Sequence, residues 1–292
     1  MPQPGPRPCP LCGSLRKRPI AAYARHHLAR CTGCGLVHTA LVPTTDELQS
    51  YYGGYPVHAE VSPITLKRYD ELLDRFEGWR TTGRILDVGC GAGHFLQRAA
   101  LRGWTAHGTE YGGQALAASR AKGIAVIEGP LDPSNYPTGH FDVVCSFEVI
   151  EHVPHPAEDL ERMVSVLRPG GLLYLTTPNF RCTGRWLSGP DWSVVNYPEH
   201  LNYFTPATFK ALARRQGLRT AWLRTTGMDL ARIRTKAGMD RTARSQVRAG
   251  QEEFRERLEG SPALNAAKRM LNGLLTLLGI GDHMKAGFVK RP

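Results

Sequence analysis

Three closely spaced glycines, Gly89, Gly91 and Gly93, follow a short apolar run, and this stretch could bind a nucleoside. Residues 85–88 have the composition of a buried parallel strand, and a helical pattern begins at His94. Glycine lacks a Cβ and accepts a positive φ, so a ligand can lie against the backbone of this turn. The dinucleotide fingerprint places its third glycine one residue later than this sequence does. The turn therefore suits a nucleoside ligand without a pyrophosphate.

Glu110 closes the next predicted strand, residues 104–109, and is the second candidate for ligand binding. It follows the glycine turn at about the distance where an acidic residue meets ribose hydroxyls in a nucleoside-binding βαβ unit. A carboxylate at this place accepts two hydroxyl hydrogen bonds. The alternative is a glycine turn without a ligand, followed by a solvated glutamate.

The sequence DVGCGAG, which begins at Asp87, resembles the first motif of the class I S-adenosylmethionine-dependent methyltransferases. The resemblance implies an α/β fold with a Rossmann-like seven-stranded sheet and helices on both faces. It also implies that S-adenosylmethionine is the methyl donor. The residues that it assigns to this cofactor are Asp87, Gly89, Cys90, Gly91, Gly93, Glu110, Leu131, Asp132, Ser146 and Phe147. Asp132 could equally be a turn residue.

Two C-x-x-C pairs, Cys9 with Cys12 and Cys31 with Cys34, have the spacing of a zinc ribbon. Four thiolates form a closed tetrahedral site without an open position for chemistry. We therefore expect a structural Zn²⁺ that holds a segment too short to have a core of its own. A finger that contacts nucleic acid or substrate, rubredoxin-like iron and a redox dithiol pair are the alternatives. His26 and His27, between the pairs, are expected at the surface.

The stretch FDVVCSFEVIEHV contains the side chains best suited to proton transfer. After a predicted strand over residues 141–147, Glu148, Glu151 and His152 stand at i, i+3 and i+4, so a helix would place them on one face. Such a face could orient His152 as a general base, hold a divalent cation against a hydroxylated substrate, or be only a polar helix start. The letters EVIEHV resemble the quinone-biosynthesis O-methyltransferases, in which these positions lie near the substrate.

A loop after residue 176 carries further candidates. It is aromatic-rich and about twenty residues long, and such loops are more often functional than idle, so we expect it to form a substrate wall. Its aromatic and polar members are Trp186, Trp192, Tyr197, His200, Asn202 and Tyr203. His200 is a second candidate base, with capping or packing as the alternative, because a helix should begin just after it at Thr205-Pro206.

The segments around these motifs alternate between strand and helix patterns, which predicts a parallel sheet covered on both faces. The predicted strands are residues 85–88, 104–109, 125–128, 141–147, 172–176 and 218–225, and the predicted helices are residues 93–101, 114–122 and 157–167. Residues 168–171, RPGG, predict a turn. Residues 283–290 predict a last, antiparallel strand.

Three regions are expected along the chain. Residues 1–45 should form the zinc ribbon, and residues 46–83 a helical lid or linker in which Tyr51, Tyr52 and Tyr55 either pack or cover the cofactor. Residues 84–292 should form the methyltransferase domain with a helical insertion at about 227–281. Within that insertion, residues 264–280 predict an amphipathic helix that packs on the sheet or on a second subunit.

Composition limits the classes of partner. The chain has 292 residues and a formal net charge of +11, which raises nucleic acid, an acidic lipid surface or an anionic substrate as partners. Basic residues are dense over residues 205–257, where a solvated helix surface and an RNA-facing patch are the alternatives. The sequence has no apolar run long enough to span a membrane and no signal-peptide pattern, so we expect a cytoplasmic protein.

These patterns together predict an enzyme that transfers a methyl group to oxygen or carbon of a small molecule. The run CTGCGLVHTALVPTTDELQSYYGGY resembles zinc-ribbon methyltransferases that modify sugars or other small metabolites, so the expected acceptor is a sugar, nucleotide-sugar or secondary metabolite. One alternative is an RNA methyltransferase that grips phosphate with its ribbon and basic helices. The other is a non-catalytic scaffold that binds the cofactor.

Overall fold

The structure is a computed structural model that describes residues 7–44, 47, 61–227 and 262–292. The chain divides into two compact units. The first unit comprises Met1–Thr44, Pro178–Phe209 and Leu223–Lys285. The second comprises Thr45–Thr177, Lys210–Trp222 and Ala286–Pro292. Tyr51, Tyr52 and Tyr55 lie outside the described residues.

A seven-stranded sheet has the strand order β10-β11-β8-β7-β4-β5-β6. The strands are β4 (Arg84–Val88), β5 (Thr105–Glu110), β6 (Ala125–Glu128), β7 (Phe141–Phe147), β8 (Leu167–Pro178), β10 (Leu218–Thr226) and β11 (His283–Lys290). Strands β4 to β8 pair in parallel. Gly281, just before β11, lies against Thr225, whereas Gly287 lies against Trp222, so β10 and β11 run in opposite directions. The predicted α/β sheet is confirmed.

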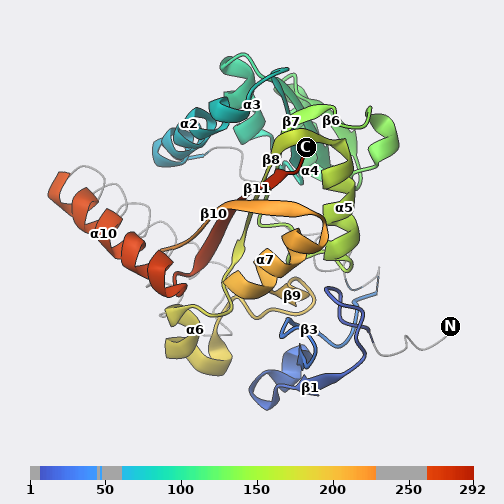
Figure 1. Cartoon of the computed structure of the whole chain (residues 1–292), viewed down its shortest axis with the longest axis vertical. Coiled ribbons are helices and arrows are strands. Elements are labelled where there is room, and N and C mark those ends of the chain that lie inside the picture. Colours follow the sequence, from blue (N-terminus) through green and yellow to red (C-terminus); the bar gives the residue numbers. More distant parts are fainter. Residues whose placement is uncertain (1–6, 45–46, 48–60, 228–261) are drawn as a thin grey trace. The chain divides into compact units, whose positions relative to one another are not determined.

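Seven α-helices lie between or beside the strands in the described part of the chain (Figure 1). They are α2 (Pro63–Phe76), α3 (His94–Leu101), α4 (Gly113–Ala121), α5 (Pro156–Val166), α6 (Thr183–Ser188), α7 (Pro206–Arg215) and α10 (Pro262–Leu278). The predicted turn over residues 168–171 is wrong, because these residues belong to β8. The sequence RPGG is accommodated instead by an irregular register between Phe141 and Val143 of β7 and by a φ of +71° at Gly170.

Helix α2 is packed into the core of the second unit. The Oγ of Ser62 accepts a hydrogen bond from the Thr65 N–H and caps the helix, which begins with a proline. Leu73 and Phe76 are fully buried, and the Phe76 ring lies 5.5 Å from that of Tyr174. Figure 1 shows α2 beside α3, the helix that follows the glycine turn. Residues 63–76 are thus part of the core beside this turn.

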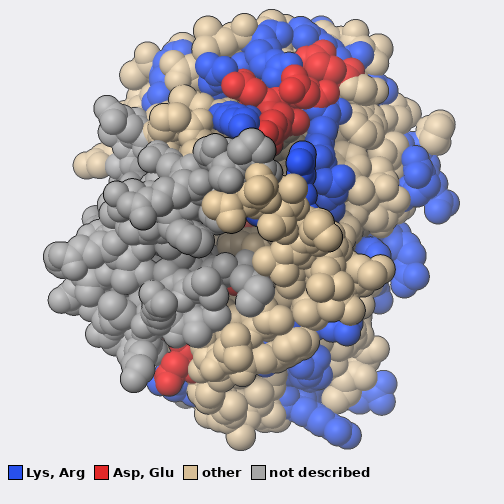
Figure 2. Space-filling view, turned by 90° about the vertical axis from the view of Figure 1, so that its left-hand side faces the viewer, with Lys and Arg blue, Asp and Glu red and all other residues tan. Residues whose placement is uncertain are grey.

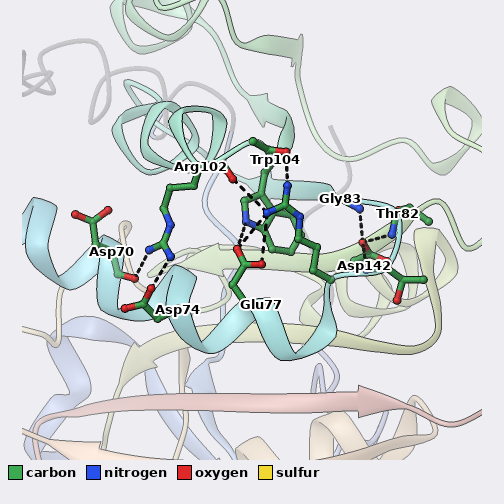
Figure 3. A network of polar contacts seen from close by, with 11 residues as sticks. Asp70, Asp74, Glu77, Thr82, Gly83, Arg102, Trp104 and Asp142 are labelled. Carbon is green, nitrogen blue, oxygen red and sulfur yellow. Dashed lines mark hydrogen bonds and ion pairs between the residues drawn. The ribbon is translucent and has the colours of Figure 1, made fainter.

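Ion pairs fasten α2 to α3. The guanidinium of Arg98 in α3 donates two hydrogen bonds to the carboxylate of Asp70, at 2.6 and 3.1 Å. Arg102 forms a second pair with Asp74, and the Trp104 indole N–H donates to Glu77 at 3.2 Å (Figure 3). These groups are partly exposed, so each pair adds little free energy, but together they fix the position of α2 on α3.

Asp142 joins the chain entering β4 to the start of β7. Its Oδ2 accepts hydrogen bonds from the backbone N–H groups of Thr81, Thr82 and Gly83, at 2.9, 2.7 and 2.7 Å (Figure 3). Its Oδ1 accepts one from Arg168 at 2.6 Å. Burial raises the pKa of this carboxyl, but the backbone and guanidinium donors outweigh burial and hold the pKa below its usual value.

The first unit has its own sheet and its own core. The four strands β1 (Lys17–Pro19), β2 (Leu28–Cys31), β3 (Val37–Thr39) and β9 (Asn202–Tyr203) pair antiparallel in that order. Its buried hydrophobic cluster is Tyr23, Leu28, Val37, Phe180, Cys182, Trp192, Val194, Val195 and Tyr203. The expected substrate wall is therefore wrong for Trp192 and Tyr203, which are core residues, whereas Trp186 is 53% exposed.

The amphipathic helix predicted near the carboxyl end is α10, which belongs to the first unit. Leu275 is buried and its carbonyl accepts a hydrogen bond from the Thr225 hydroxyl at 2.6 Å. The other large apolar residues of this helix are exposed, namely Leu264, Met270, Leu271, Leu274, Leu277 and Leu278. Among the described residues, no helix is both long and apolar enough to cross a membrane.

Replacing Asp142 with asparagine should destabilise the fold by about 3–5 kcal/mol, because the variant leaves Arg168 without its charge partner. Asp74→Asn is the matched control, since Asp74 is 68% exposed in its pair with Arg102 and should cost less than about 1 kcal/mol. Chemical denaturation of both variants measures the difference. Equal effects would show that the buried carboxylate is not a principal fastening of the sheet.

The pH dependence of Asp142 has a definite sign. Because its pKa is lowered by folding, its carboxylate stabilises the protein above the pKa of the unfolded chain, and this contribution is lost as pH falls through the folded pKa. The stability difference between wild type and Asp142→Asn should therefore shrink below about pH 4. Denaturation at pH 3 and pH 7 tests this expectation.

Candidate active site

The glycine turn follows β4 and is fixed by backbone hydrogen bonds to β5. The N–H groups of Gly89 and Cys90 both donate to the Thr109 carbonyl, at 2.9 and 3.0 Å. Gly89, Gly91 and Gly93 have φ values of +77°, +54° and +73°, a region that side-chain-bearing residues rarely adopt. The sequence places glycine at each residue of the turn where the backbone requires it.

The surroundings of the three glycines differ. A Cβ on Gly89 would lie 2.6 Å from Val149, and one on Gly93 would lie 2.9 Å from Ser119. A Cβ on Gly91 would meet no atom within 4 Å. Gly89 and Gly93 are thus required by packing, whereas the Gly91 backbone has open space in front of it, as a close approach by a ligand needs.

Glu110 lies at the end of β5 and contacts this turn. Its Oε2 accepts a hydrogen bond from the Gly91 N–H at 2.8 Å, and its Oε1 accepts one from the Tyr111 N–H at 2.9 Å. A carboxylate has about four lone-pair sites, so each oxygen retains capacity for a further donor. The acidic residue and the glycine that the sequence singled out therefore meet in one place.

Asp87 is fully buried in β4, two residues before Gly89. Burial raises its pKa to about 8; the Cys145 thiol beside it lowers the pKa in part, and the charge of Glu110 raises it further. Its Oδ1 has no hydrogen-bond partner among the described residues. A buried polar atom of this kind is expected where a ligand completes the hydrogen bonding.

The other predicted cofactor residues have structural contacts. The Ser146 hydroxyl donates to the Val88 carbonyl at 2.8 Å, and Phe147 packs 5.0 Å from the Phe95 ring. Leu131 is buried. Asp132 caps a 3-10 turn, accepting the Ser134 N–H at 2.9 Å, which matches its alternative as a turn residue. Burial, with Asp87 and Glu110 nearby, raises the pKa of the Cys90 thiol, so Cys90 is not a thiolate nucleophile.

The segment after β7 is a turn, so the helical face expected for Glu148, Glu151 and His152 is wrong. The reason is Glu148, whose φ of +53° lies in the left-handed region and is incompatible with a right-handed helix. Its backbone N–H donates to the Thr176 hydroxyl of β8 at 3.1 Å. Helix α5 begins only at Pro156. The ligand atoms of these three residues do not all lie within 4.8 Å of one another, and a divalent cation beside them stays a prediction.

Glu151 and His152 nevertheless stay close together. The Glu151 Oε1 and His152 Nε2 atoms are 3.9 Å apart. Glu151 is 2% exposed and accepts a hydrogen bond from the Thr177 hydroxyl at 2.9 Å, which fixes its carboxylate. His152 is partly exposed, so a fixed acid lies beside an imidazole that solvent or a ligand can reach.

His200 lies in the first unit, between the buried core segment and β9. Its Nδ1 is 2.7 Å from the Val194 carbonyl, and its backbone N–H donates to the Asn196 carbonyl at 2.8 Å. A donor bond from Nδ1–H to a carbonyl would leave Nε2 as the basic nitrogen of the neutral ring.

Sequence reasoning missed two contributors to these sites. Thr176 and Thr177 hold the turn after β7, but threonine in a strand gives no signal of such a role. Tyr69 of α2 lies near Asp87, whose charge together with burial raises the Tyr69 pKa, and its ring packs 5.4 Å from that of Phe95. The helical spacing of Tyr69 was visible in the sequence, but its proximity to Asp87 was not.

The four cysteines of the two C-x-x-C pairs come together in the first unit. The Sγ atoms of Cys9 and Cys34 are 3.5 Å apart, as are those of Cys12 and Cys31, and all four lie within 4.8 Å of one another. A tetrahedral zinc with Zn–S bonds of about 2.3 Å places its sulfurs about 3.8 Å apart. The arrangement therefore has the dimensions of a four-thiolate metal site.

Residues 63–221, more than half of the chain, match the family model described as "Methyltransferase domain". The chain is also similar to two ubiquinone biosynthesis O-methyltransferases. The protein from Marinobacter nauticus is 32% identical over 135 residues, which are 42% of this chain and 53% of that protein. The protein from Thiobacillus denitrificans is 29% identical over 186 residues, which are 59% of this chain and 77% of that protein.

Solved structures with the same fold include a putative sarcosine dimethylglycine methyltransferase from Galdieria sulphuraria, with a TM-score of 0.54 and 16% identity over 84% of this chain and 98% of that one. The S-adenosylmethionine-dependent methyltransferase from Archaeoglobus fulgidus has a TM-score of 0.52 and 17% identity over 83% of this chain and 98% of that one. At these identities the likeness shows the fold alone. Because the family model spans both the glycine turn and Glu110, the chain belongs to the S-adenosylmethionine-dependent methyltransferases.

Proposed function

We propose that this protein transfers the methyl group of S-adenosylmethionine to a hydroxyl, or to an activated carbon, of a small metabolite. The observation that carries this proposal is the hydrogen bond between Gly91 and Glu110, 2.8 Å long, beside a backbone with open space in front of it. It joins the two features by which a nucleoside is held, a glycine turn and an acid for its ribose.

The donor would lie against Gly91, with its ribose hydroxyls on Glu110. The unpartnered Oδ1 of Asp87 is an acceptor for the donor's amino acid end, while Ser146 and Phe147 form the neighbouring strand end. The sulfonium of S-adenosylmethionine supplies an already activated methyl group. The chain therefore needs to bind, orient and exclude water, and to accept a proton where the acceptor has one.

Among the described residues of the second unit, we take His152 as the candidate base. Glu151 is fixed by Thr177 and stands 3.9 Å from the imidazole, so its carboxylate can orient the ring and stabilise the cation that forms on proton transfer. His200 is the second candidate base. The similar ubiquinone biosynthesis proteins are O-methyltransferases by name, which supports a hydroxyl acceptor. The ribbon resemblance favours a sugar, nucleotide-sugar or secondary metabolite.

RNA is the alternative acceptor. On the face drawn in Figure 2, the described Lys and Arg residues lie in separate groups, with a band of Asp and Glu among them. An RNA acceptor would need a continuous basic surface, which the described part of this one face does not form. A scaffold without catalytic activity is the third reading, and it predicts donor binding without transfer.

Transfer of label from isotopically labelled S-adenosylmethionine into host extract tests the proposal. The extract is first split into small-molecule, nucleic-acid and protein fractions, and Glu110→Ala protein is the blank. We expect label in the small-molecule fraction. Label in RNA alone would establish the alternative acceptor, and donor binding without any label above the blank would contradict an enzymatic role.

Glu110→Gln should weaken S-adenosylmethionine binding at least about tenfold, because a neutral amide is a weaker acceptor for ribose hydroxyls and for the Gly91 N–H. Glu128→Gln is the matched control, since Glu128 stands opposite Glu110 in the parallel register but is exposed. Calorimetric titration gives both dissociation constants. Equal affinities in the two variants would place the ribose elsewhere.

Gly91→Ala tests whether the donor lies against the turn. Gly123→Ala is matched in backbone strain, because Gly123 also has a positive φ of +75° and no atom within 4 Å of a Cβ. Both variants should lose about 1 kcal/mol of stability. Only Gly91→Ala should lose donor affinity, by tenfold or more, and a donor affinity like that of Gly123→Ala would exclude close approach at Gly91.

We propose that the four-cysteine cluster holds one structural Zn²⁺. Purified protein should release one zinc per chain to a colorimetric chelator after its thiols are blocked, and Cys12→Ser should release much less. Cys182→Ser is the control, because Cys182 is buried in the same unit, where its pKa is raised to about 12, and lies outside the cluster. Iron in place of zinc, visible by its absorbance, would contradict the assignment.

A further inference from the structure

The zinc ribbon and the segment that carries His200 form one antiparallel sheet within the first unit. Strand β3 of the ribbon pairs with β9, with Val37 opposite Tyr203 and His38 opposite Asn202. The Thr39 N–H donates to the Leu201 carbonyl at 2.9 Å. The chain immediately after His200 is therefore hydrogen-bonded to the ribbon.

Arg7 strengthens this junction. It is 6% exposed, and its guanidinium donates to the Leu201 carbonyl at 3.2 Å, to the Thr39 hydroxyl at 2.9 Å and to the Asn202 side-chain oxygen at 3.1 Å. Arg7 stands two residues before the cluster residue Cys9. The position of Arg7 thus depends on the fold of the ribbon. Its guanidinium donates hydrogen bonds to Leu201 and Asn202, the two residues that follow His200.

The ribbon also contacts the chain before His200. The Tyr197 N–H donates to Nδ1 of His26 at 3.4 Å, and the Tyr197 ring meets the edge of the His27 ring at 5.1 Å. Both histidines lie between the C-x-x-C pairs, and they are partly or fully exposed, as expected of surface residues. The ribbon therefore holds the His200 segment from both sides.

We propose that the ribbon is a positioning clamp for the His200 segment, with Arg7 as its chief positioning residue, so that metal loading controls the acceptor side of the reaction and not donor binding. This rests on the proposed function, which takes His200 as an acceptor-side residue. A ribbon of this size lacks enough core to fold without its metal. Loss of the metal should therefore break the hydrogen bonds from the Arg7 guanidinium to Leu201 and Asn202.

The donor residues do not share this dependence. Gly91 and Glu110 belong to the second unit, whose core is built from the strands β4, β6, β7 and β8 and the helices α2, α3 and α4. The cores of the two units have no residue in common. Loss of the clamp should therefore slow methyl transfer while leaving the affinity for S-adenosylmethionine unchanged.

Arg7→Lys in the full-length, zinc-loaded protein tests the clamp, since lysine keeps the charge but cannot span three acceptors. Arg30→Lys is the control, because Arg30 is an exposed ribbon residue that donates to Gly35 within the ribbon. We expect amide hydrogen exchange over residues 196–204 to be at least tenfold faster in Arg7→Lys than in the control. Zinc content should be equal, and the affinity for S-adenosylmethionine should agree within twofold.

Unchanged exchange over residues 196–204 in Arg7→Lys would overturn the clamp. If that variant loses its zinc, Asn202→Ala replaces it, because this change removes one acceptor of Arg7 and leaves the ribbon's own residues intact. Chelation of the wild type should reproduce the faster exchange with donor affinity retained. Loss of donor affinity on chelation would overturn the proposal, because the ribbon would then support the whole fold.

Methyl transfer into the small-molecule fraction of host extract is measured on the same samples. It should fall at least tenfold in Arg7→Lys and stay at the wild-type level in Arg30→Lys. Wild-type protein that binds donor but transfers no label would refute the proposed function, while the exchange result would still decide whether the clamp exists. Equal transfer by the two variants, despite faster exchange in Arg7→Lys, would overturn control of the acceptor side.

Discussion

The hydrogen bond from the Gly91 N–H to the Glu110 carboxylate ties the glycine turn to the end of β5, and our proposal for donor binding depends on it. It is short because β4 and β5 pair in parallel register, so that both strands end at the same edge of the sheet. The register is held in turn by the Thr109 carbonyl, which accepts two N–H groups of the turn. The pairing of β4 with β5, the conformation of the glycine turn and the position of the Glu110 carboxylate therefore depend on one another.

The chain has two separate hydrophobic cores, one in each unit. The core beneath the glycine turn uses aromatic rings from α2, α3, β7 and β8, and α2 is fastened to α3 by Asp70 and Asp74. The other core joins the ribbon to the segment after β8 through rings such as Tyr23, Phe180 and Trp192. A cysteine-rich segment that could not fold alone thereby gains apolar partners, and the segment after β8 gains a sheet.

The elements that carry a periodic pattern and a clear boundary were predictable from sequence. Helices α3, α4 and α5 and strands β6, β7 and β11 have their expected limits within one residue, because apolar spacing and glycine or proline mark them. The turn at Glu148 was not predictable, since a non-glycine residue with positive φ has no sequence signal. Nor was the pairing of β3 with β9, which depends on residues far apart in the chain. Local patterns carry no information on such contacts.

The acidic side chains show why residue type alone does not identify a site. Asp142 accepts four hydrogen bonds, which fills its acceptor capacity, so it can only be structural. Glu110 accepts one hydrogen bond from the turn at Oε2 and one from the Tyr111 N–H at Oε1, so each oxygen keeps capacity for a further donor, and Asp87 has one oxygen without a partner among the described residues. All three acids lie in strands of one sheet. The motif around the glycine turn singled out Asp87 and Glu110, whereas nothing in the sequence indicated the role of Asp142. The hydrogen bonds of these three carboxylates therefore differ: those of Asp142 fasten the sheet, whereas Glu110 and Asp87 keep acceptor capacity that our proposal assigns to the donor.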